Sequence, residues 1–229
     1  PYTHTASWKT YVDEALNRAK QTGVKEKDYW TQLLRAISKT GDTRLFDYVL
    51  NYMLKELNLE LDVSMLRSYA MCIYQKSHYL LGEVSYSLDE NVEPVIPPNH
   101  DILISVHNVI SLADSAQLRL DSECYNYVLG ALARARLSPE LDQLLRDLKS
   151  ARSDFQLNTI GYFAQVCAIL SNKELPVEQR LQQIEKVHHE ALNRELSSRD
   201  HVRFEHFNVG HFTDYLTTFD PKRGHYHIF

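Results

Sequence analysis

Histidine is concentrated toward one end of the chain, where seven of the eleven His residues lie between His188 and His227. Imidazole binds metal ions, so this cluster is the first candidate for chemistry. His201, His206 and His211 are five residues apart, and side chains at that spacing on a helix point about 140° away from each other. No HExxH motif or paired cysteine accompanies them, and the polar, partly aromatic character of an interface explains the same residues. The spacing therefore favours an interface over a metal site.

The common motifs of catalytic sites are missing from the sequence. It contains no G-x-S-x-G nucleophile elbow, no G-x-x-x-x-G-K-[ST] phosphate loop and no G-x-G-x-x-G fingerprint, and its seven glycines are scattered. Adjacent acidic pairs such as Asp13-Glu14 and Asp89-Glu90 are explained more simply as solvated charge. We therefore expect a protein that is not an enzyme and that binds no cofactor.

The three cysteines, Cys72, Cys124 and Cys167, are far apart, and each lies within an apolar run. An odd number of cysteines without CxxC pairing predicts buried, reduced thiols in a compartment that is not oxidising. No apolar run reaches the roughly 18 to 20 residues that a membrane span requires, so no membrane span is expected.

The elements that must position these residues are helices. One helical face is formed by apolar residues three and four positions apart, namely Tyr125, Val128, Leu129 and Leu132. The pattern breaks at Ser138-Pro139, which suit an N-cap and a first helical residue, and it resumes at Leu141. A third apolar run begins at Asn158. Only seven Gly and seven Pro interrupt the chain, so we predict an all-α fold.

The same order of helix, break, helix and linker occurs upstream. Residues 30–41 and 44–55 form two helical patterns, and residues 59–62, Leu-Glu-Leu-Asp, form the linker. Two helices in a period of roughly 30 to 40 residues are the signature of a helical repeat.

This order resembles the pentatricopeptide repeat, whose first helix opens with an aromatic–Asn pair and whose second ends in Met or Leu before a Gly, Pro or Asp linker. Tyr125-Asn126 and Leu148 match it in one unit. In the other unit the matching residues are Trp30, Lys39, Gly41, Met53 and Asp62. The resemblance implies a short helical-hairpin solenoid of the pentatricopeptide or tetratricopeptide type. An ordinary irregular helical bundle is the alternative.

The resemblance divides the chain into three parts. Residues 1–27 hold an N-terminal cap helix, expected at 7–20, and a charged connector. Residues 28–195 hold four units of the repeat, and residues 196–229 form an extended tail rich in aromatic residues and histidine. The second unit is degenerate, with helices expected at 63–75 and 101–113 and its linker at 118–121; the fourth has helices at 158–170 and 177–196.

A long insertion interrupts the second unit between residues 78 and 99. Its three prolines cannot lie inside a helix, so we predict a loop, which is either a partner-docking loop or a passive insertion. The tail holds five of the eight Phe residues, so it packs on something, either as a cap on the last unit or, as we favour, as an arm on a neighbouring subunit. The candidate partner-binding residues are Phe204, Phe207, Phe212, Tyr215, Phe219, Tyr226, Phe229, Tyr79 and Tyr86.

The charge of the chain argues against RNA as its ligand. Its net charge is -5, and residues 83–101 contain five acidic residues and no Lys or Arg, whereas phosphate recognition needs concentrated positive charge. In the pentatricopeptide family a base is read by a small polar residue near the start of the first helix together with Asp or Asn at the end of the repeat. The corresponding residues here are Tyr127 with Gln156, Gln32 with Asp62, and Tyr162 or Gly161. Most units lack this code.

The resemblance implies an organelle, because pentatricopeptide-like proteins are overwhelmingly mitochondrial or plastid. It implies a non-catalytic subunit that docks on protein subunits of a large mitochondrial assembly. In size, repeat type and charge the chain is similar to the short pentatricopeptide-like subunits on the catalytic F1 head of euglenozoan ATP synthase. Mitochondrial ribosome subunits of the same repeat type fit nearly as well, and an RNA-binding maturation factor is the rival hypothesis.

Overall fold

The computed structural model describes residues 3–81, 84–87, 99–198 and 225–228. Within this part of the chain there are nine helices and one two-stranded ribbon. The helices are α1 (Thr3–Thr22), α2 (Lys27–Ser38), α3 (Thr43–Lys55), α4 (Val63–Leu81), α5 (His100–Ser115), α6 (Ser122–Arg134), α7 (Ser138–Ala151), α8 (Thr159–Ser171) and α9 (Val177–Ser198); the strands are β1 (Val84–Ser87) and β2 (His225–Ile228). The predicted all-helical class is therefore confirmed for the described residues, with a short ribbon added.

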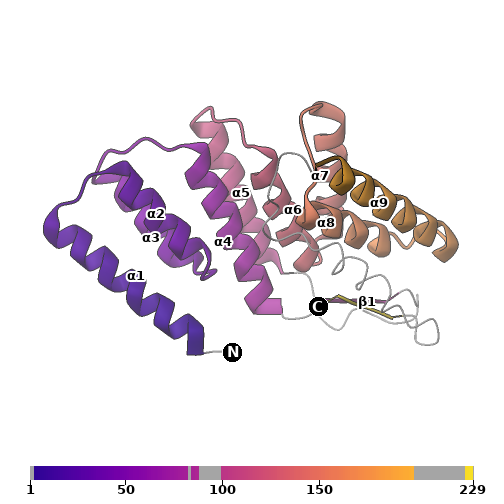
Figure 1. The fold of residues 1–229 in the computed structure, drawn as a ribbon, viewed down its shortest axis with the longest axis horizontal. Coiled ribbons are helices and arrows are strands. Elements are labelled where there is room, and N and C mark those ends of the chain that lie inside the picture. Colours follow the sequence, from indigo (N-terminus) through magenta and orange to yellow (C-terminus); the bar gives the residue numbers. More distant parts are fainter. Residues whose placement is uncertain (1–2, 82–83, 88–98, 199–224, 229) are drawn as a thin grey trace.

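The helices follow one another along the longest axis of the molecule, from α1 at one end to α9 at the other (Figure 1). The even-numbered helices α2, α4, α6 and α8 form a row in which each packs on the next. The odd-numbered helices α3, α5 and α7 each pack on the even helix before and the even helix after, while α1 covers α2 and α9 covers α8. This packing is compatible with a helical-repeat arrangement.

Three of the even helices are entered through linkers of the same design. Asp62, Asp121 and Asn158 stand just before α4, α6 and α8, and the side chain of each accepts a hydrogen bond of 2.8–3.0 Å from a first-turn amide. Such caps satisfy amides that have no partner inside the helix. The preceding tripeptides, at 59–61, 118–120 and 155–157, each place two apolar side chains against the core. The third linker, Phe-Gln-Leu-Asn, was not predicted from the sequence.

Backbone conformation repeats at these joints as well. Asn58 and Gln117, which immediately precede the first two linkers, both have positive φ, at 54° and 52°. Gly41 and Arg136, which follow α2 and α6, have φ of 69° and 57°. At Gly41 a side chain is excluded sterically, because a Cβ atom there would lie 2.7 Å from the backbone nitrogen of Lys76. The chain therefore turns at corresponding points in different hairpins.

A buried asparagine fastens α6 to the linker before α8. Asn126 is 1 % exposed, and its Nδ2 donates to the carbonyl oxygens of Ser122 (2.7 Å) and Gln156 (2.9 Å). Its Oδ1 accepts from the backbone amide of Asn158 (3.2 Å). Gly161 packs directly on this amide, since a Cβ atom there would lie 1.9 Å from Asn126 Oδ1. The Asn of the predicted aromatic–Asn pair therefore joins two successive hairpins.

The predicted loop at 78–99 is wrong at its beginning. Helix α4 continues to Leu81, and residues 84–87 form β1. The physical reason is local, because the run up to Gly82 contains no helix breaker and the first proline comes only at Pro94. Residues 88–98 lie outside the described residues.

Part of the tail pairs with this insertion. Strands β1 and β2 are antiparallel, in a register that sets Val84 opposite Ile228 and Ser87 opposite His225. Residues 225–228 therefore fold back on their own chain, which the favoured prediction of an arm on a neighbouring subunit did not anticipate. Residues 196–198 belong to α9, and residues 199–224 and 229 lie outside the described part.

Candidate docking surface

The predicted partner-binding residues fall largely outside the described part of the chain. Phe204, Phe207, Phe212, Tyr215, Phe219 and Phe229 are all outside it. Tyr79 lies in α4, Tyr86 in β1 and Tyr226 in β2. The ladder register places Tyr86 opposite Tyr226, and β1 lies beside α8. The backbone therefore brings together two tyrosines that are 140 positions apart in the sequence.

A second group of aromatic residues is described completely and lies on the row of even helices. We call it the arginine–aromatic cluster; it consists of Tyr74 from α4, Tyr127 and Arg134 from α6, and Phe163 from α8. The rings of Tyr74 and Tyr127 have centroids 5.9 Å apart. The guanidinium carbon of Arg134 lies 5.3 Å from the Tyr74 ring centroid and 5.4 Å from that of Phe163. Three successive even helices thus contribute to one cluster.

A glycine makes this convergence possible. Gly130 lies one turn before Arg134 on α6, and a Cβ atom there would come within 2.3 Å of the Ile160 side chain and 2.8 Å of the Tyr74 ring. Any side chain at this position would push α4 or α8 away from α6. The three rings of the cluster are half-buried and the arginine is buried.

Arg134 lacks the polar partners that Arg152 has. It is 9 % exposed, and its Nε atom is shielded from solvent and makes no hydrogen bond. No carboxylate of the described residues forms an ion pair with it. By contrast, Arg152 donates to the carbonyl oxygen of Leu120 at 2.7 Å and pairs with Asp154 at 3.2 Å. Among the described residues, the contacts that compensate the Arg134 charge are those with the Tyr74 and Phe163 ring faces.

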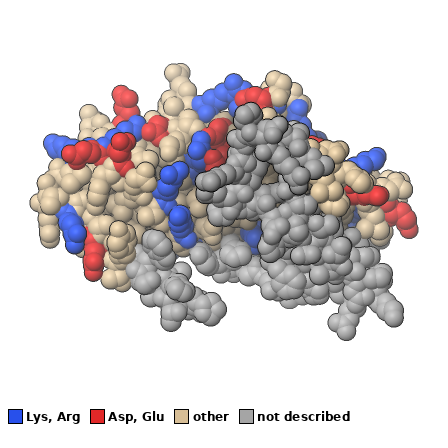
Figure 2. Space-filling model, viewed as in Figure 1, with Lys and Arg blue, Asp and Glu red and all other residues tan. Residues whose placement is uncertain are grey.

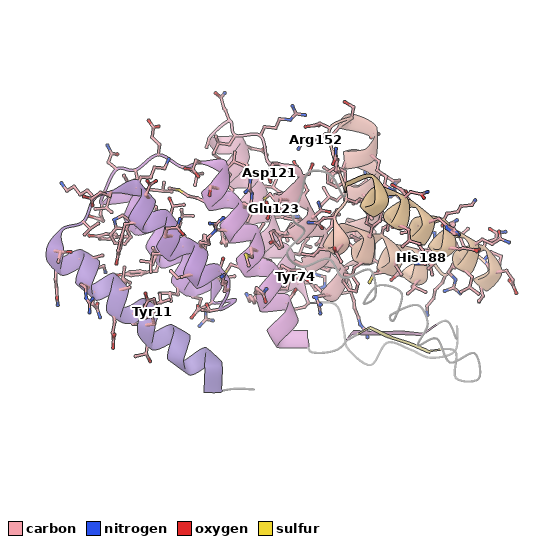
Figure 3. All side chains as sticks on the ribbon, viewed as in Figure 1. Tyr11, Tyr74, Asp121, Glu123, Arg152 and His188 are labelled. Atoms are coloured by element: carbon pink, nitrogen blue, oxygen red, sulfur yellow. The ribbon has the colours of Figure 1, made fainter. Side chains whose placement is uncertain are left out.

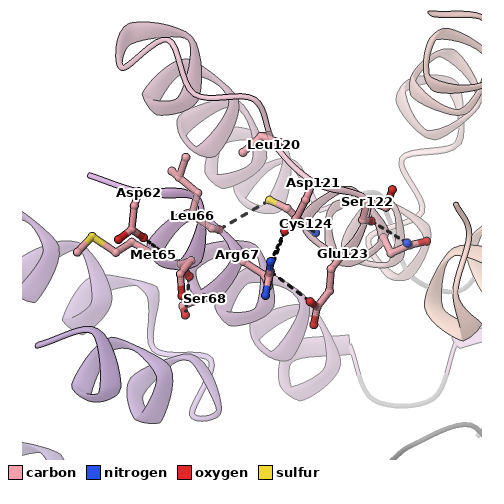
Figure 4. A network of polar contacts seen from close by, with 12 residues as sticks. Asp62, Met65, Leu66, Arg67, Ser68, Leu120, Asp121, Ser122, Glu123 and Cys124 are labelled. Atoms are coloured by element: carbon pink, nitrogen blue, oxygen red, sulfur yellow. Dashed lines mark hydrogen bonds and ion pairs between the residues drawn. The ribbon is translucent and has the colours of Figure 1, made fainter. Parts of the chain in front are cut away.

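The opposite edge of the same row, where α6 begins, carries an ion-pair network. Arg67 of α4 contacts both Asp121 and Glu123, with its Nε 3.0 Å from Asp121 Oδ2 and 3.2 Å from Glu123 Oε2 (Figure 4). Asp121 also caps α6, so one carboxylate serves the helix end and the ion pair. In Figure 3 Asp121 and Glu123 lie at the edge of this row where α6 begins, and Tyr74 lies toward the opposite edge. Burial, assisted by Glu123, raises the pKa of Tyr127, so that its hydroxyl stays protonated.

Within the described part of the chain, two grooves lie beside odd-numbered helices. The larger, of about 430 Å³, lies between α3 and α5 over α4, and its lining includes Asp47, Asn51, Tyr69, Asn108, Ser111 and Ser115. Burial raises the pKa of Asp47, although its hydrogen bond with the Tyr69 hydroxyl opposes the shift. The smaller, of about 220 Å³, lies between α7 and α9 over α8 and contains Asp142, whose pKa burial also raises. Asp47 and Asp142 each stand five residues after the N-cap of their helix, so the grooves occupy corresponding positions.

The residues that correspond to the base-reading positions of the pentatricopeptide family are mostly engaged within the protein. Asp62 pairs with Lys27 at 2.8 Å as well as capping α4. Tyr162 is 2 % exposed and donates to Glu190 at 3.3 Å. Tyr127 belongs to the arginine–aromatic cluster, whereas Gln32 is exposed.

Charges of both signs are interspersed over the visible face of the helices (Figure 2). Among the described residues, no group of three or more His, Cys, Asp or Glu is placed to hold a metal ion. None of the helices in the described ranges combines the length and apolar character that crossing a bilayer requires.

Comparisons with models of protein families, with curated proteins and with solved structures give no match.

Sequence reasoning did not find the arginine–aromatic cluster. Arg134 interrupts an apolar run, Leu129 to Leu137, in which every other residue except Arg136 is Gly, Ala or Leu. Helical spacing puts position 134 on the buried side of α6, so a charged residue there could have indicated a candidate site. The ring partners of Arg134 could not be predicted in the same way, because Tyr74 lies on α4 and Phe163 on α8, far from Arg134 in the sequence.

Proposed function

We propose that this protein is a non-catalytic accessory subunit of the pentatricopeptide-like type, a short helical solenoid that docks on another protein by surface contacts. The observation that carries the proposal is the arginine–aromatic cluster, in which Tyr74, Tyr127, Arg134 and Phe163 meet across three helices. Tyr and Arg are the residue types most enriched among the dominant contacts of protein interfaces. A row of packed helices offers the broad surface on which such contacts are usually displayed.

The nature of the setting follows from the family resemblance. We propose a mitochondrial assembly, with the F1 catalytic head of ATP synthase as the first partner to test and the mitochondrial ribosome as the next. The acidic net charge of -5 and the internal engagement of Asp62 and Tyr162 support a polypeptide partner over single-stranded RNA.

The test is binding of the purified chain to the isolated F1 head of the source organism, measured by mass photometry and by titration. Tyr127→Ala should lower the affinity at least tenfold, because a dominant aromatic contact of an interface contributes about 2 kcal/mol or more and about 1.4 kcal/mol corresponds to tenfold. Tyr48→Ala is the matched control, since Tyr48 is 51 % exposed and lies on α3 in the odd-numbered row.

A parallel titration with single-stranded RNA across a salt series separates the rival function. Submicromolar RNA affinity that falls steeply with salt would replace the proposal by an RNA-binding role. Equal affinity of the two tyrosine variants for F1 would exclude the cluster as the docking surface.

A further inference from the structure

The arginine–aromatic cluster contains a charge that the described part of the chain leaves without a counter-ion. The Arg134 side chain is nine-tenths buried, and its shielded Nε has no hydrogen-bond acceptor. Burying a guanidinium without a hydrogen-bonded anion is unfavourable, and contacts with two ring faces offset only part of that cost. The acids at the start of α6, Asp121 and Glu123, both contact Arg67 and lie at the other end of this helix from Arg134.

We propose that the Arg134 guanidinium is a receptor for a carboxylate group presented by the docked polypeptide. The inference rests on the proposed docking function and adds the chemistry of the contact. Tyr74 and Phe163 hold the guanidinium at 5.3 and 5.4 Å from their ring centroids and so restrict its orientation. A guanidinium that is already oriented loses less conformational freedom when a carboxylate forms two parallel hydrogen bonds with it.

The surroundings favour a single carboxylate over a phosphate chain. A polyanion would have to approach a protein of net charge -5, and Glu123 lies near Tyr127 in the same row. One acidic side chain on an otherwise neutral or basic protein surface avoids most of this repulsion. The aromatic rings around the arginine also suit a polypeptide, because they exclude water from the ion pair as the surface around it becomes covered.

A small carboxylate tests the site without any partner. We expect sodium acetate to raise the melting temperature of the wild-type protein relative to sodium chloride at equal ionic strength. Arg134→Gln should abolish this difference, and Arg134→Lys, which keeps the charge but loses the planar fork, should reduce it. Arg146→Gln, a variant of an exposed arginine on α7, is the control and should behave as wild type. The same acetate effect in all four proteins would overturn the proposal.

The partner measurement then separates the carboxylate contact of Arg134 from the docking function. If F1 or another partner binds the wild type, Arg134→Gln should weaken binding at least tenfold while the circular dichroism spectrum stays unchanged. A change smaller than twofold would remove the carboxylate contact and leave the docking function intact. If the wild type binds no partner, the docking function fails, and the acetate experiment alone decides whether Arg134 binds anions.

Discussion

Replacing Asn126 by alanine should destabilise the protein by about 2 to 4 kcal/mol. The side chain is 1 % exposed and makes three hydrogen bonds of 2.7 to 3.2 Å, of which the two to Gln156 and Asn158 cross from α6 to the linker before α8. Each internal hydrogen bond contributes roughly 0.5 to 1.5 kcal/mol, and a buried group left without a partner costs about 1 to 3 kcal/mol. Alanine would leave the carbonyl oxygen of Gln156 and the backbone amide of Asn158 without this hydrogen-bond partner.

Urea unfolding followed by circular dichroism measures this loss, and hydrogen exchange of the α8 amides locates it. The control is Asn51→Ala, because exposed Asn51 makes the same bond within a helix, with its Nδ2 2.8 Å from the Asp47 carbonyl oxygen, but no hydrogen bond to another hairpin among the described residues. We expect that variant to lose less than about 0.5 kcal/mol. If the two variants differ by no more than this amount, the fastening role of Asn126 is refuted.

Asn126→Asp sharpens the same test through pH. A carboxylate can accept from the Asn158 amide but cannot donate to the two carbonyl oxygens, so ionisation is unfavourable in the folded state and the pKa of the new acid is raised above its unfolded value of about 3.9. The variant should therefore be less stable than wild type at pH 7 and recover as the pH falls through that folded pKa.

Three further outcomes follow from the described contacts. The thiols should not react with iodoacetamide at pH 8 until urea unfolds the chain, because all are buried and burial raises the pKa of Cys124 to about 12; labelling counted by mass spectrometry in the folded protein would contradict this. Gly130→Ala should cost about 1 to 3 kcal/mol in urea unfolding by forcing helices apart, more than Gly23→Ala, where open space leaves only the backbone strain of a φ of 67°. Asp47→Asn should be more stable than wild type at pH 7, since the raised pKa of Asp47 makes its ionised form unfavourable in the folded state; the difference should vanish in acid-range thermal melts below about pH 4.

Helices were predictable from this sequence because their signals are local. The spacing at Tyr125 to Leu132 and the Asp that ends two linkers depend on residues within one or two turns, and α6 and the capped α4 appear where those signals place them. The Ser-Pro signal places α7 correctly to within one residue, but its N-cap is Leu137, without a side-chain cap, and not the predicted Ser138. The same locality explains the error at residues 78–81, where prolines further along the insertion were given too much weight over an uninterrupted helical run.

The cluster and the ribbon could not be predicted because they depend on distant partners. Residues 84–87 pair with residues 225–228, and no property of either tetrapeptide specifies the other. Arg134 was visible as an unusual residue in an apolar run, but its ring partners are fixed by how closely α4 and α8 approach Gly130. The predicted partner-binding phenylalanines stay predictions, since they lie outside the described residues.

The matching linkers before α4, α6 and α8 make the joints of this molecule interchangeable. Each joint brings two apolar anchors and one capping side chain to the start of an even helix, so a chain lengthened by one copied hairpin would meet its neighbour through a junction that already exists. A duplicated hairpin would therefore meet its neighbour through the same cap and apolar contacts. The number of hairpins can therefore change over evolutionary time while the geometry of each connection is retained.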